Sequence, residues 1–316
     1  MRFLLRRVNS LHPEQKANGT AAAVACLTLA FLQLECPPRP AGADTIRLMS
    51  SKPTTVVINQ DKPVAPPADE TLTPEQLSER NLAKKIEILK KGITFLQSTP
   101  DYTALFTKRE LVNGEMLDEQ TMSMKVRHEP FSVYLKWLDY DTGREVMYVD
   151  GVNDGKMLVH AGGWKARLPA LLMSPDSSLA MKEARYPVTR AGILALANSI
   201  IEYNGKDLEL KNFARCQQLE DQSVGDRNCC CFVLEYKDRD SSPEYRKSVT
   251  LIDKEWSVPL FITNFAWPNE DLVDADTDLD EATLIEQYSY SEVRFRTSLT
   301  QLDFDHANDD YGFRRQ

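Results

Sequence analysis

The sequence has few of the residues from which most active sites are built. It contains four histidines, and the three that lie beyond residue 43, His128, His160 and His306, are isolated from one another along the chain. No serine stands in a G-x-S-x-G turn, and no glycine-rich loop precedes a helix pattern in the way that cradles phosphate. These absences argue against histidine-based acid–base catalysis, serine hydrolysis and phosphate-loop nucleotide binding.

Long apolar runs are also scarce, because only residues 20–34 form one. Arginines precede this run, and the small residues Ala41-Gly42-Ala43 follow it. That order is typical of a signal peptide, which we predict over residues 1–43. The run is shorter than the ~20 residues of a membrane-spanning helix. We therefore expect an exported protein, periplasmic or extracellular, and retention by an uncleaved N-terminal anchor stays open as the alternative.

Basic residues are outnumbered by acidic ones, 38 to 47, which gives a formal net charge of −9. Such a surface repels phosphate backbones, so nucleic acid is excluded as an expected partner. The acidic run 270–281 matches the first ligand spacings of an EF-hand loop. However, Leu279 and Ile285 stand where that loop needs glycine and glutamate. We predict a solvated loop there, no metal site and no cofactor.

Of the six cysteines, two lie in the predicted signal peptide, and the others are Cys216 and the triplet 229–231. Their spacing is not that of a zinc site. Outside the cytoplasm, a thiol pair within reach tends to oxidise. Cys216 and Cys229 lie on consecutive predicted strands that flank a turn, so we predict a disulfide between them. A shift of one residue in the strand register would replace Cys229 by another cysteine of the triplet.

Two helices are predicted. Residues 44–72 are rich in proline, serine and threonine and have no sustained period, which indicates a flexible linker. A helix from Thr73 to Gln97 follows, with a capping threonine, a proline at the first helical position and apolar residues at spacings of three and four. A second helix runs from Thr189 to Tyr203, where an Asn-Gly pair would end it.

The remaining pattern has a period of two, which predicts strands. No strand–helix–strand alternation occurs, so a doubly wound nucleotide-binding fold is excluded and the fold class is α+β, with about ten strands in one antiparallel sheet that is large enough to curl. The predicted strands are two that meet at Asn113-Gly114, followed by 126–137, 143–150, 156–161, a short 164–168, 213–220, 229–237, 245–253, 258–267 and 284–295.

The stretch VRHEPFSVYLKW, Val126 to Trp137, raises the functional question. Its apolar residues alternate with Ser132, Tyr134 and Lys136, as in a half-buried strand. Two helices hardly cover a curved sheet of about ten strands, so the sheet either closes on itself or leaves a cavity. The candidate cavity-lining residues are Met122, Met124, Phe131, Val133, Leu135 and Trp137. The alternative is that these side chains pack in an ordinary core beneath the helices.

Several stretches in fixed order carry a family resemblance: MKVRHEPFSVYLKWL, GREVMYVDGVNDGKMLVHAGGW, LIDKEWSVPLFITNFAWP and LTQLDFDHANDDYGF. They resemble domain-of-unknown-function family 1571, an uncharacterised family of exported bacterial proteins. That family is distantly similar to periplasmic outer-membrane lipoprotein carriers. The resemblance implies a single domain over residues 73–313, a strongly curved antiparallel sheet that forms an unclosed half β-barrel, and two principal helices packed on its concave side. It assigns no catalytic residue.

Three functions follow from this reading. The first is a non-enzymatic envelope protein that binds an apolar ligand, an acyl chain or a lipoprotein, in the half-barrel cavity. The second is a structural or protein-interaction module of the envelope, with a self-filled barrel and no ligand. The third, a hydrolase that uses Asp253 and Glu255, is least favoured, because carboxylates at strand ends are common on acidic surfaces. The oligomeric state is left open.

Overall fold

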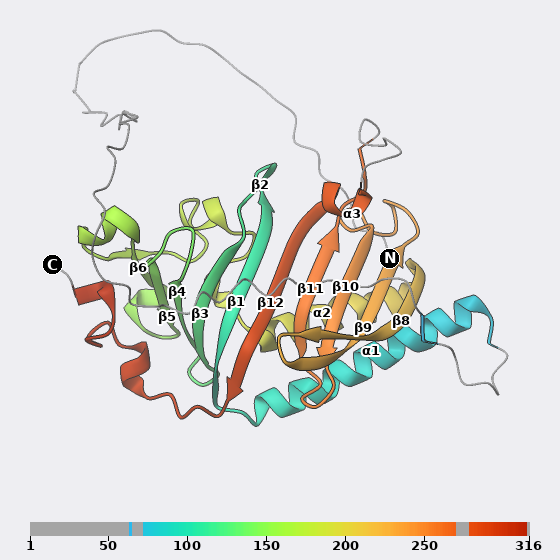
Figure 1. Cartoon of the computed structure of the whole chain (residues 1–316), viewed down its shortest axis with the longest axis horizontal. Helices are drawn as coiled ribbons and strands as arrows, with labels where there is room; N and C mark the ends of the chain where they lie inside the picture. Colours follow the sequence, from blue (N-terminus) through green and yellow to red (C-terminus); the bar gives the residue numbers. More distant parts are fainter. Residues whose placement is uncertain (1–62, 65–71, 270–277, 315–316) are drawn as a thin grey trace, which may run out of the picture. The chain divides into compact units, whose positions relative to one another are not determined.

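The computed structural model describes residues 63–64, 72–269 and 278–314 (Figure 1). All of these residues belong to one compact unit. The predicted signal peptide and most of the predicted linker lie outside the described residues, so both stay predictions. Within the described part of the chain, no helix is long and apolar enough to cross a membrane.

The first helix, α1 (Pro74–Gln97), has the bounds that the sequence predicts. Thr73 and Gln76 form a capping box: the Gln76 amide donates to Thr73 Oγ1 (3.2 Å), and the Thr73 amide donates to Gln76 Oε1 (2.9 Å). The capping box thereby pairs two backbone amides that would otherwise lack a hydrogen-bond partner at the start of the helix. The inward stripe, from Leu82 to Leu96, is buried, so the apolar face of α1 anchors it to the sheet.

The described strands form one antiparallel sheet of twelve, in the order β7-β6-β5-β4-β3-β1-β12-β11-β10-β9-β8, with β2 paired to β1 (Figure 1). One meander runs from β1 to β7 and another from β8 to β12, and the pairing of β1 with β12 joins them. The strands are β1 (Asp101–Val112), β2 (Glu115–Met116), β3 (Gln120–Arg127), β4 (Ser132–Trp137), β5 (Glu145–Val149), β6 (Met157–His160), β7 (Leu171–Met173), β8 (Phe213–Val224), β9 (Arg227–Tyr236), β10 (Lys247–Asp253), β11 (Pro259–Phe265) and β12 (Leu284–Phe295).

The strands β7 and β8 form the two edges of this sheet, so the sheet is unclosed. α1 and α2 (Ile193–Leu210) pack against each other and lie on the same, concave face, behind the strands in Figure 1. The main core lies between these helices and the strands. The prediction of an α+β, half-barrel-like antiparallel sheet with two principal helices on one face is confirmed.

The largest differences from the predicted strands lie at 126–137 and 164–168, and β8 also runs four residues further than predicted, to Val224. Val126 and Arg127 belong to β3 rather than to the next strand, and β4 begins only after a turn that contains a cis peptide bond between Glu129 and Pro130. Residues 164–168 are not a strand, because a 3₁₀ helix, Gly163–Arg167, occupies them and β7 follows. The Leu168 amide donates to the Lys165 carbonyl oxygen (2.9 Å), which is the hydrogen bond of a 3₁₀ turn rather than of a strand pair.

The second helix starts later and ends later than predicted: Thr189 lies in the 3₁₀ helix Val188–Arg190, and α2 begins at Ile193. The Asn204-Gly205 pair lies inside α2, which continues to Leu210 and ends at Lys211 in the left-handed conformation. The Asn204 side chain donates to Asp207 Oδ2 (3.4 Å), within the helix. An Asn-Gly pair therefore ends a helix only if its backbone adopts non-helical dihedral angles. Here the apolar contacts of α2 hold both residues in the helical conformation.

Short helices and the C-terminal segment complete the unit. Tyr134, Met147 and Val149 point away from α1 and α2, and residues near the C-terminus cover them in a second, smaller core. Tyr134 and Tyr311 stack with ring centroids 4.1 Å apart. Both faces of β4 and β5 are thus buried. The short helices are Asn153–Gly155, Gly163–Arg167, Ala180–Glu183, Val188–Arg190, α3 (Leu279–Ala282), Gln301–Phe304 and Gly312–Arg314.

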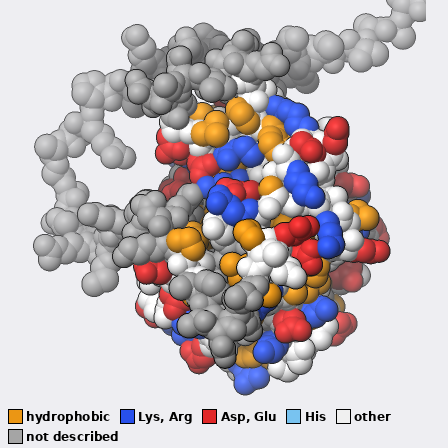
Figure 2. Space-filling model, turned by 90° about the vertical axis from the view of Figure 1, so that its right-hand side faces the viewer, with side chains coloured by type: hydrophobic (Ala, Val, Ile, Leu, Met, Phe, Trp, Pro, Cys, Tyr) orange, Lys and Arg blue, Asp and Glu red, His pale blue; other side chains and the backbone are white. Residues whose placement is uncertain are grey.

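Charges of both signs are interspersed on the face that Figure 2 displays, the right-hand side of Figure 1. β8 and β9 lie toward that side in Figure 1, and ion pairs such as Arg215–Glu235 (2.6 Å) join these two strands. Exposed pairs of this kind contribute at most about 1 kcal/mol each. They do not account for the stability of the sheet, which rests on its buried faces.

Candidate ligand-binding cavity

A cavity of about 220 Å³ lies between the helix-bearing face of the sheet, α2 and the connecting segment 175–192. Its wall runs across the sheet, from Met157 on β6 to Tyr236 on β9. Apolar and aromatic side chains form most of the wall, and polar groups gather at separate places along it. A pocket of this composition is the usual form of a small-molecule site.

The apolar wall comes from alternating positions of β1, β3 and β4. Met122 and Trp137 face each other across the β3–β4 pair, and Leu135 follows on the same face. The Trp137 indole N–H donates to Gln120 Oε1 (2.9 Å), so the ring borders the cavity while its one polar atom is satisfied. On the helix side, Ala195, Leu196 and Ile200 of α2 line the cavity.

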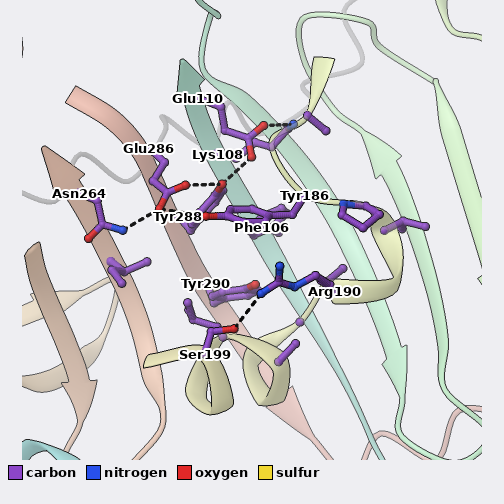
Figure 3. Close-up of a pocket in the computed structure, with 18 of the residues that line it drawn as sticks. Phe106, Lys108, Glu110, Tyr186, Arg190, Ser199, Asn264, Glu286, Tyr288 and Tyr290 are labelled. Carbon is purple, nitrogen blue, oxygen red and sulfur yellow. Dashed lines mark hydrogen bonds and ion pairs between the residues drawn. The ribbon is translucent and has the colours of Figure 1, made fainter. Parts of the chain in front are cut away.

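An aromatic ridge separates this apolar wall from the polar groups. Phe106 stacks with Tyr290 and with Tyr288 at centroid distances of 4.9 and 6.0 Å, and all three rings line the cavity. Figure 3 shows the ridge between the labelled carboxylates and α2. The ridge gives the cavity a rigid wall, because stacked rings on adjacent strands have little freedom to move.

Two glutamates face the cavity beyond the ridge. Glu110 and Glu286 stand directly opposite each other on β1 and β12 and are both buried. Lys108 Nζ donates to Glu110 Oε2 (2.6 Å), and Asn264 Nδ2 donates to Glu286 Oε1 (2.7 Å). The Tyr288 hydroxyl lies between them and donates to Glu110 Oε1 (2.5 Å) (Figure 3).

The same glutamates have further partners from the segment that covers the cavity. Arg185 Nε donates to Glu286 Oε2 (2.9 Å), and the same arginine pairs with Glu244. Burial and the charge of Glu286 raise the pKa of Tyr186 to about 12. Because every carboxylate of this network is matched by a cation or by neutral donors, the network stabilises the cavity wall rather than presenting an open pair of acid–base groups.

Two arginines lie where the covering segment meets the cavity. Arg144 Nη1 pairs with Glu183 (2.7 Å) and its guanidinium lies 4.8 Å from the Trp137 ring centroid. Arg190 is exposed, stacks on the Tyr186 ring at 5.1 Å and contacts the Ser199 hydroxyl at 3.4 Å. This end of the cavity is thus framed by cations on aromatic rings.

The other end of the cavity contains a residue that the sequence analysis did not single out. Lys85 on α1 is 1 % exposed and lines the cavity together with Asn204 and Tyr236. Desolvation by burial lowers the pKa of Lys85 from 10.5 to about 8, although Cys216 and Asp207 act in the opposite direction. The signal was present in the sequence, since Lys85 stands in the apolar stripe three residues after Leu82.

Three of the six predicted cavity residues, Met122, Leu135 and Trp137, line the cavity. Met124, Val133 and Phe131 do not. Met124 and Val133 are buried in the main core, and Phe131 is half-buried against Tyr148. The reason is the start of α2: the Ile193 amide donates to the Tyr102 hydroxyl (2.8 Å). Tyr102 stands opposite Val126, and Val126 stands opposite Val133, so α2 packs over that end of the sheet. That the cavity binds a ligand remains a proposal.

The predicted disulfide between Cys216 and Cys229 is wrong, because both residues are free thiols. The register explains this: Cys216 stands opposite Leu234, whereas Cys229 stands opposite Gln222. The two cysteines are therefore offset by five residues along β9, or about 17 Å, and a disulfide needs Cα atoms within about 7 Å. The other two cysteines of the triplet are free as well.

The residues that the least favoured hydrolase reading requires have structural partners. Asp253 is fully buried and accepts from Arg227 Nε (2.8 Å) and from the Trp256 amide (2.7 Å). Glu255 pairs with the same arginine (2.8 Å). Neither residue lines the cavity described above. The two carboxylates hold the β10–β11 turn to β9.

The histidines and the acidic run supply no site in the described residues. His128 Nδ1 lies 2.7 Å from the Thr99 carbonyl oxygen, and His160 Nε2 lies 3.1 Å from that of Ala166. Both are packed histidines with backbone partners. Most of the acidic run, residues 270–277, lies outside the described residues, and Asp278 caps the short α3. No cluster of potential metal ligands occurs among the residues that the structure describes.

Comparison with known proteins gives one family match. A family model described as "Protein of unknown function (DUF1571)" matches residues 99–313, and no curated protein matches the chain. Solved structures with similar folds include a putative outer membrane lipoprotein-sorting protein domain from Vibrio parahaemolyticus (14% identity, 71% of this chain and 97% of that chain covered, TM-score 0.32). Others are the lipoprotein LppX of Mycobacterium tuberculosis (9%, 71% and 99%, 0.39) and a LolA superfamily protein from Nitrosomonas europaea (11%, 69% and 96%, 0.29).

Proposed function

This chain belongs to the DUF1571 family of proteins of unknown function, and from that premise we propose that it is a non-enzymatic, exported protein of the cell envelope that holds one acyl chain in its half-barrel cavity. The observation that carries the proposal is the cavity itself, which the sheet and α2 enclose without filling. The polar groups of its wall are mostly paired with one another, so an acyl chain can lie along the apolar side chains between them.

The size of the cavity indicates the size of the ligand. An engineered apolar cavity of about 150 Å³ binds benzene, and drug-sized ligands take pockets from about 300 Å³ upward. A volume of about 220 Å³ lies between these. It suits a single acyl chain rather than a lipid with several chains.

The experiment is a titration with cis-parinaric acid, a straight-chain fatty acid that fluoresces in apolar sites. We expect saturable binding of one molecule per chain. Leu135→Phe narrows the cavity and should weaken binding while leaving the melting temperature unchanged, because the added atoms enter open space. Val133→Leu is the matched control on the same strand and face: it overpacks a filled site, costs about 1–3 kcal/mol and lowers the melting temperature without affecting binding.

A different observation favours a second candidate function, an envelope module that binds a protein partner. Large apolar side chains are more than half exposed along residues 164–179, and Trp164 is 82 % exposed. A gathered apolar surface marks an interaction site more often than scattered exposed residues do. If the wild type binds no cis-parinaric acid, and Trp164→Ser releases an envelope protein that co-purifies with the wild type, this second function replaces the first.

A further inference from the structure

We propose that the inner end of the cavity is a carboxylate subsite, in which Lys85 Nζ pairs with the head group of a single-chain fatty acid whose acyl chain extends along the apolar wall toward Trp137. This inference rests on the proposed function, because it names the head group of the ligand for which the cavity has room. It assigns the ligand an orientation, with its charged end inside.

Lys85 is a buried cation that has no contact partner. Its side chain is 1 % exposed and lines the cavity, yet its ammonium makes no hydrogen bond or ion pair with any described residue. A lysine ammonium has three N–H donors, and leaving them unpaired away from water is strongly unfavourable. The Lys85 ammonium therefore has N–H donors that face the cavity and are available to a ligand.

Nearby groups do not supply the missing acceptor. Asp207 on α2 attracts Lys85 without contacting it, and its Oδ2 already accepts from Tyr236 Oη (2.9 Å) and from Asn204 Nδ2 (3.4 Å). The thiols of Cys216 on β8 and Cys231 on β9 are neutral, because burial raises the pKa of each to about 12. The one carboxylate that acts on Lys85 is thus that of Asp207, which already accepts hydrogen bonds from Tyr236 and Asn204.

Asn204 marks the same place independently. Its Oδ1 is buried and has no hydrogen-bond partner, and the residue lines the cavity beside Lys85. Two polar side chains from different helices, Lys85 of α1 and Asn204 of α2, thus line the same cavity with polar atoms that have no hydrogen-bond partner among the described residues. Buried polar atoms in native proteins are nearly always paired. Among the described residues, eight buried side-chain polar atoms lack a hydrogen-bond partner, and only Asn204 Oδ1 belongs to a residue that lines the cavity. Together with Lys85, it points to the polar end of a ligand.

The charge of Lys85 selects the ligand class. A hydroxyl or an ester can accept one hydrogen bond, but it leaves the buried positive charge without compensation. A carboxylate accepts the bond and offsets the charge, and charge-assisted hydrogen bonds are about twice as strong as neutral ones. The negative charge of Asp207 repels the carboxylate of the ligand, so removing this charge should strengthen binding of the ligand.

The test compares dodecanoate with dodecanol, which share one chain and differ in the head group, by calorimetric titration of the full chain. We expect the wild type to bind dodecanoate more tightly. Lys85→Met should weaken dodecanoate binding about 10- to 100-fold, the usual effect of removing a hydrogen bond to a charged group, and should leave dodecanol binding nearly unchanged. Asp207→Asn should strengthen dodecanoate binding only.

Lys84→Met is the matched control. Lys84 is the neighbouring residue on α1, but it is exposed and donates to Gln218 Oε1 (2.8 Å), so its loss should affect neither ligand. Equal affinity of the wild type for both ligands, or an unchanged dodecanoate affinity in Lys85→Met, overturns the subsite and leaves the proposed function standing. Failure of the wild type to bind either ligand overturns both. The wild-type comparison decides the matter even if a variant fails to fold.

Discussion

At the scale of single residues, Lys85 stands in the inward stripe of α1, where an apolar side chain would pack without penalty. Leu82 and Leu89, the neighbouring stripe residues, are fully buried with it. A buried lysine in such a stripe lowers stability unless a partner compensates it. This sets a stability prediction that does not depend on any ligand.

Lys85→Met should raise the free energy of unfolding at pH 7 by up to about 3 kcal/mol, because burial lowers the Lys85 pKa from 10.5 to about 8. Below pH 8, Lys85 is protonated in both the folded and the unfolded state, so the wild type is destabilised by the full cost of burying this charge. Between pH 8 and 10.5 the unfolded state alone stays protonated, so wild-type stability rises with pH relative to the variant. Urea unfolding at pH 7 and near pH 10 measures the difference.

The control for this experiment is Lys84→Met, whose stability should follow that of the wild type at both pH values. A Lys85→Met variant that is less stable than the wild type at pH 7, or whose advantage does not shrink toward pH 10, would contradict the assignment of Lys85 as an unpaired buried cation.

The free thiols give a second residue-scale prediction. Burial raises the pKa of Cys229 and of Cys231 to about 12, which suppresses the reactive thiolate. Cys230 lies between them but is half-buried. In the folded protein a thiol reagent should therefore label Cys230 first, and peptide mapping after labelling identifies the site. Faster labelling of Cys229 or Cys231 than of Cys230 would contradict the packing of β9.

At the scale of elements, the length of α2 can be tested with glycine. A Cβ at Gly205 meets nothing within 4 Å, and this glycine has an ordinary helical φ. Gly205→Ala should therefore stabilise the protein by about 0.5–1 kcal/mol. The contrast is Gly92 on α1, where a Cβ would overlap the Ser257 carbonyl oxygen, so Gly92→Ala should destabilise. Thermal unfolding of both variants distinguishes a continuous α2 from a helix that stops at the Asn-Gly pair.

The C-terminal segment gives a second element-scale prediction. Phe304 is buried in the smaller core against β4 and β5, whereas Leu302 in the same short helix is 55 % exposed. Phe304→Ala should cost about 3–5 kcal/mol, and Leu302→Ala should change stability by no more than about 0.5 kcal/mol. Equal effects in urea unfolding would show that this segment does not cover the sheet.

Element boundaries were predictable where local chemistry defines them. The cap at Thr73 and the apolar stripe place α1, and the alternation from Leu284 to Phe295 places β12. Local sequence patterns did not predict the boundaries that tertiary contacts determine. The contacts of α2 carry it through Gly205, and the 3₁₀ turn that the Leu168 amide closes on the Lys165 carbonyl oxygen replaces the strand predicted at 164–168.

At the scale of the whole molecule, the cavity belongs to no single stretch of sequence. Its lining residues run from Lys85 on α1 to Tyr290 on β12. The period-two pattern identified the apolar face of β3 and β4, and thereby Met122, Leu135 and Trp137. It could not indicate that the start of α2 fills the space over Val133. Nor could it indicate the register of β8 on β9, which keeps Cys216 and Cys229 apart.

The space between α2 and the sheet is, we propose, a binding site for one acyl chain. The most direct measurement is a crystal structure of the protein grown with dodecanoic acid. We expect one chain of density along Met122, Leu135 and Trp137, with its carboxylate at Lys85. Protein side chains that fill this space, or a fatty acid bound only at the exposed apolar residues around Trp164, would contradict it.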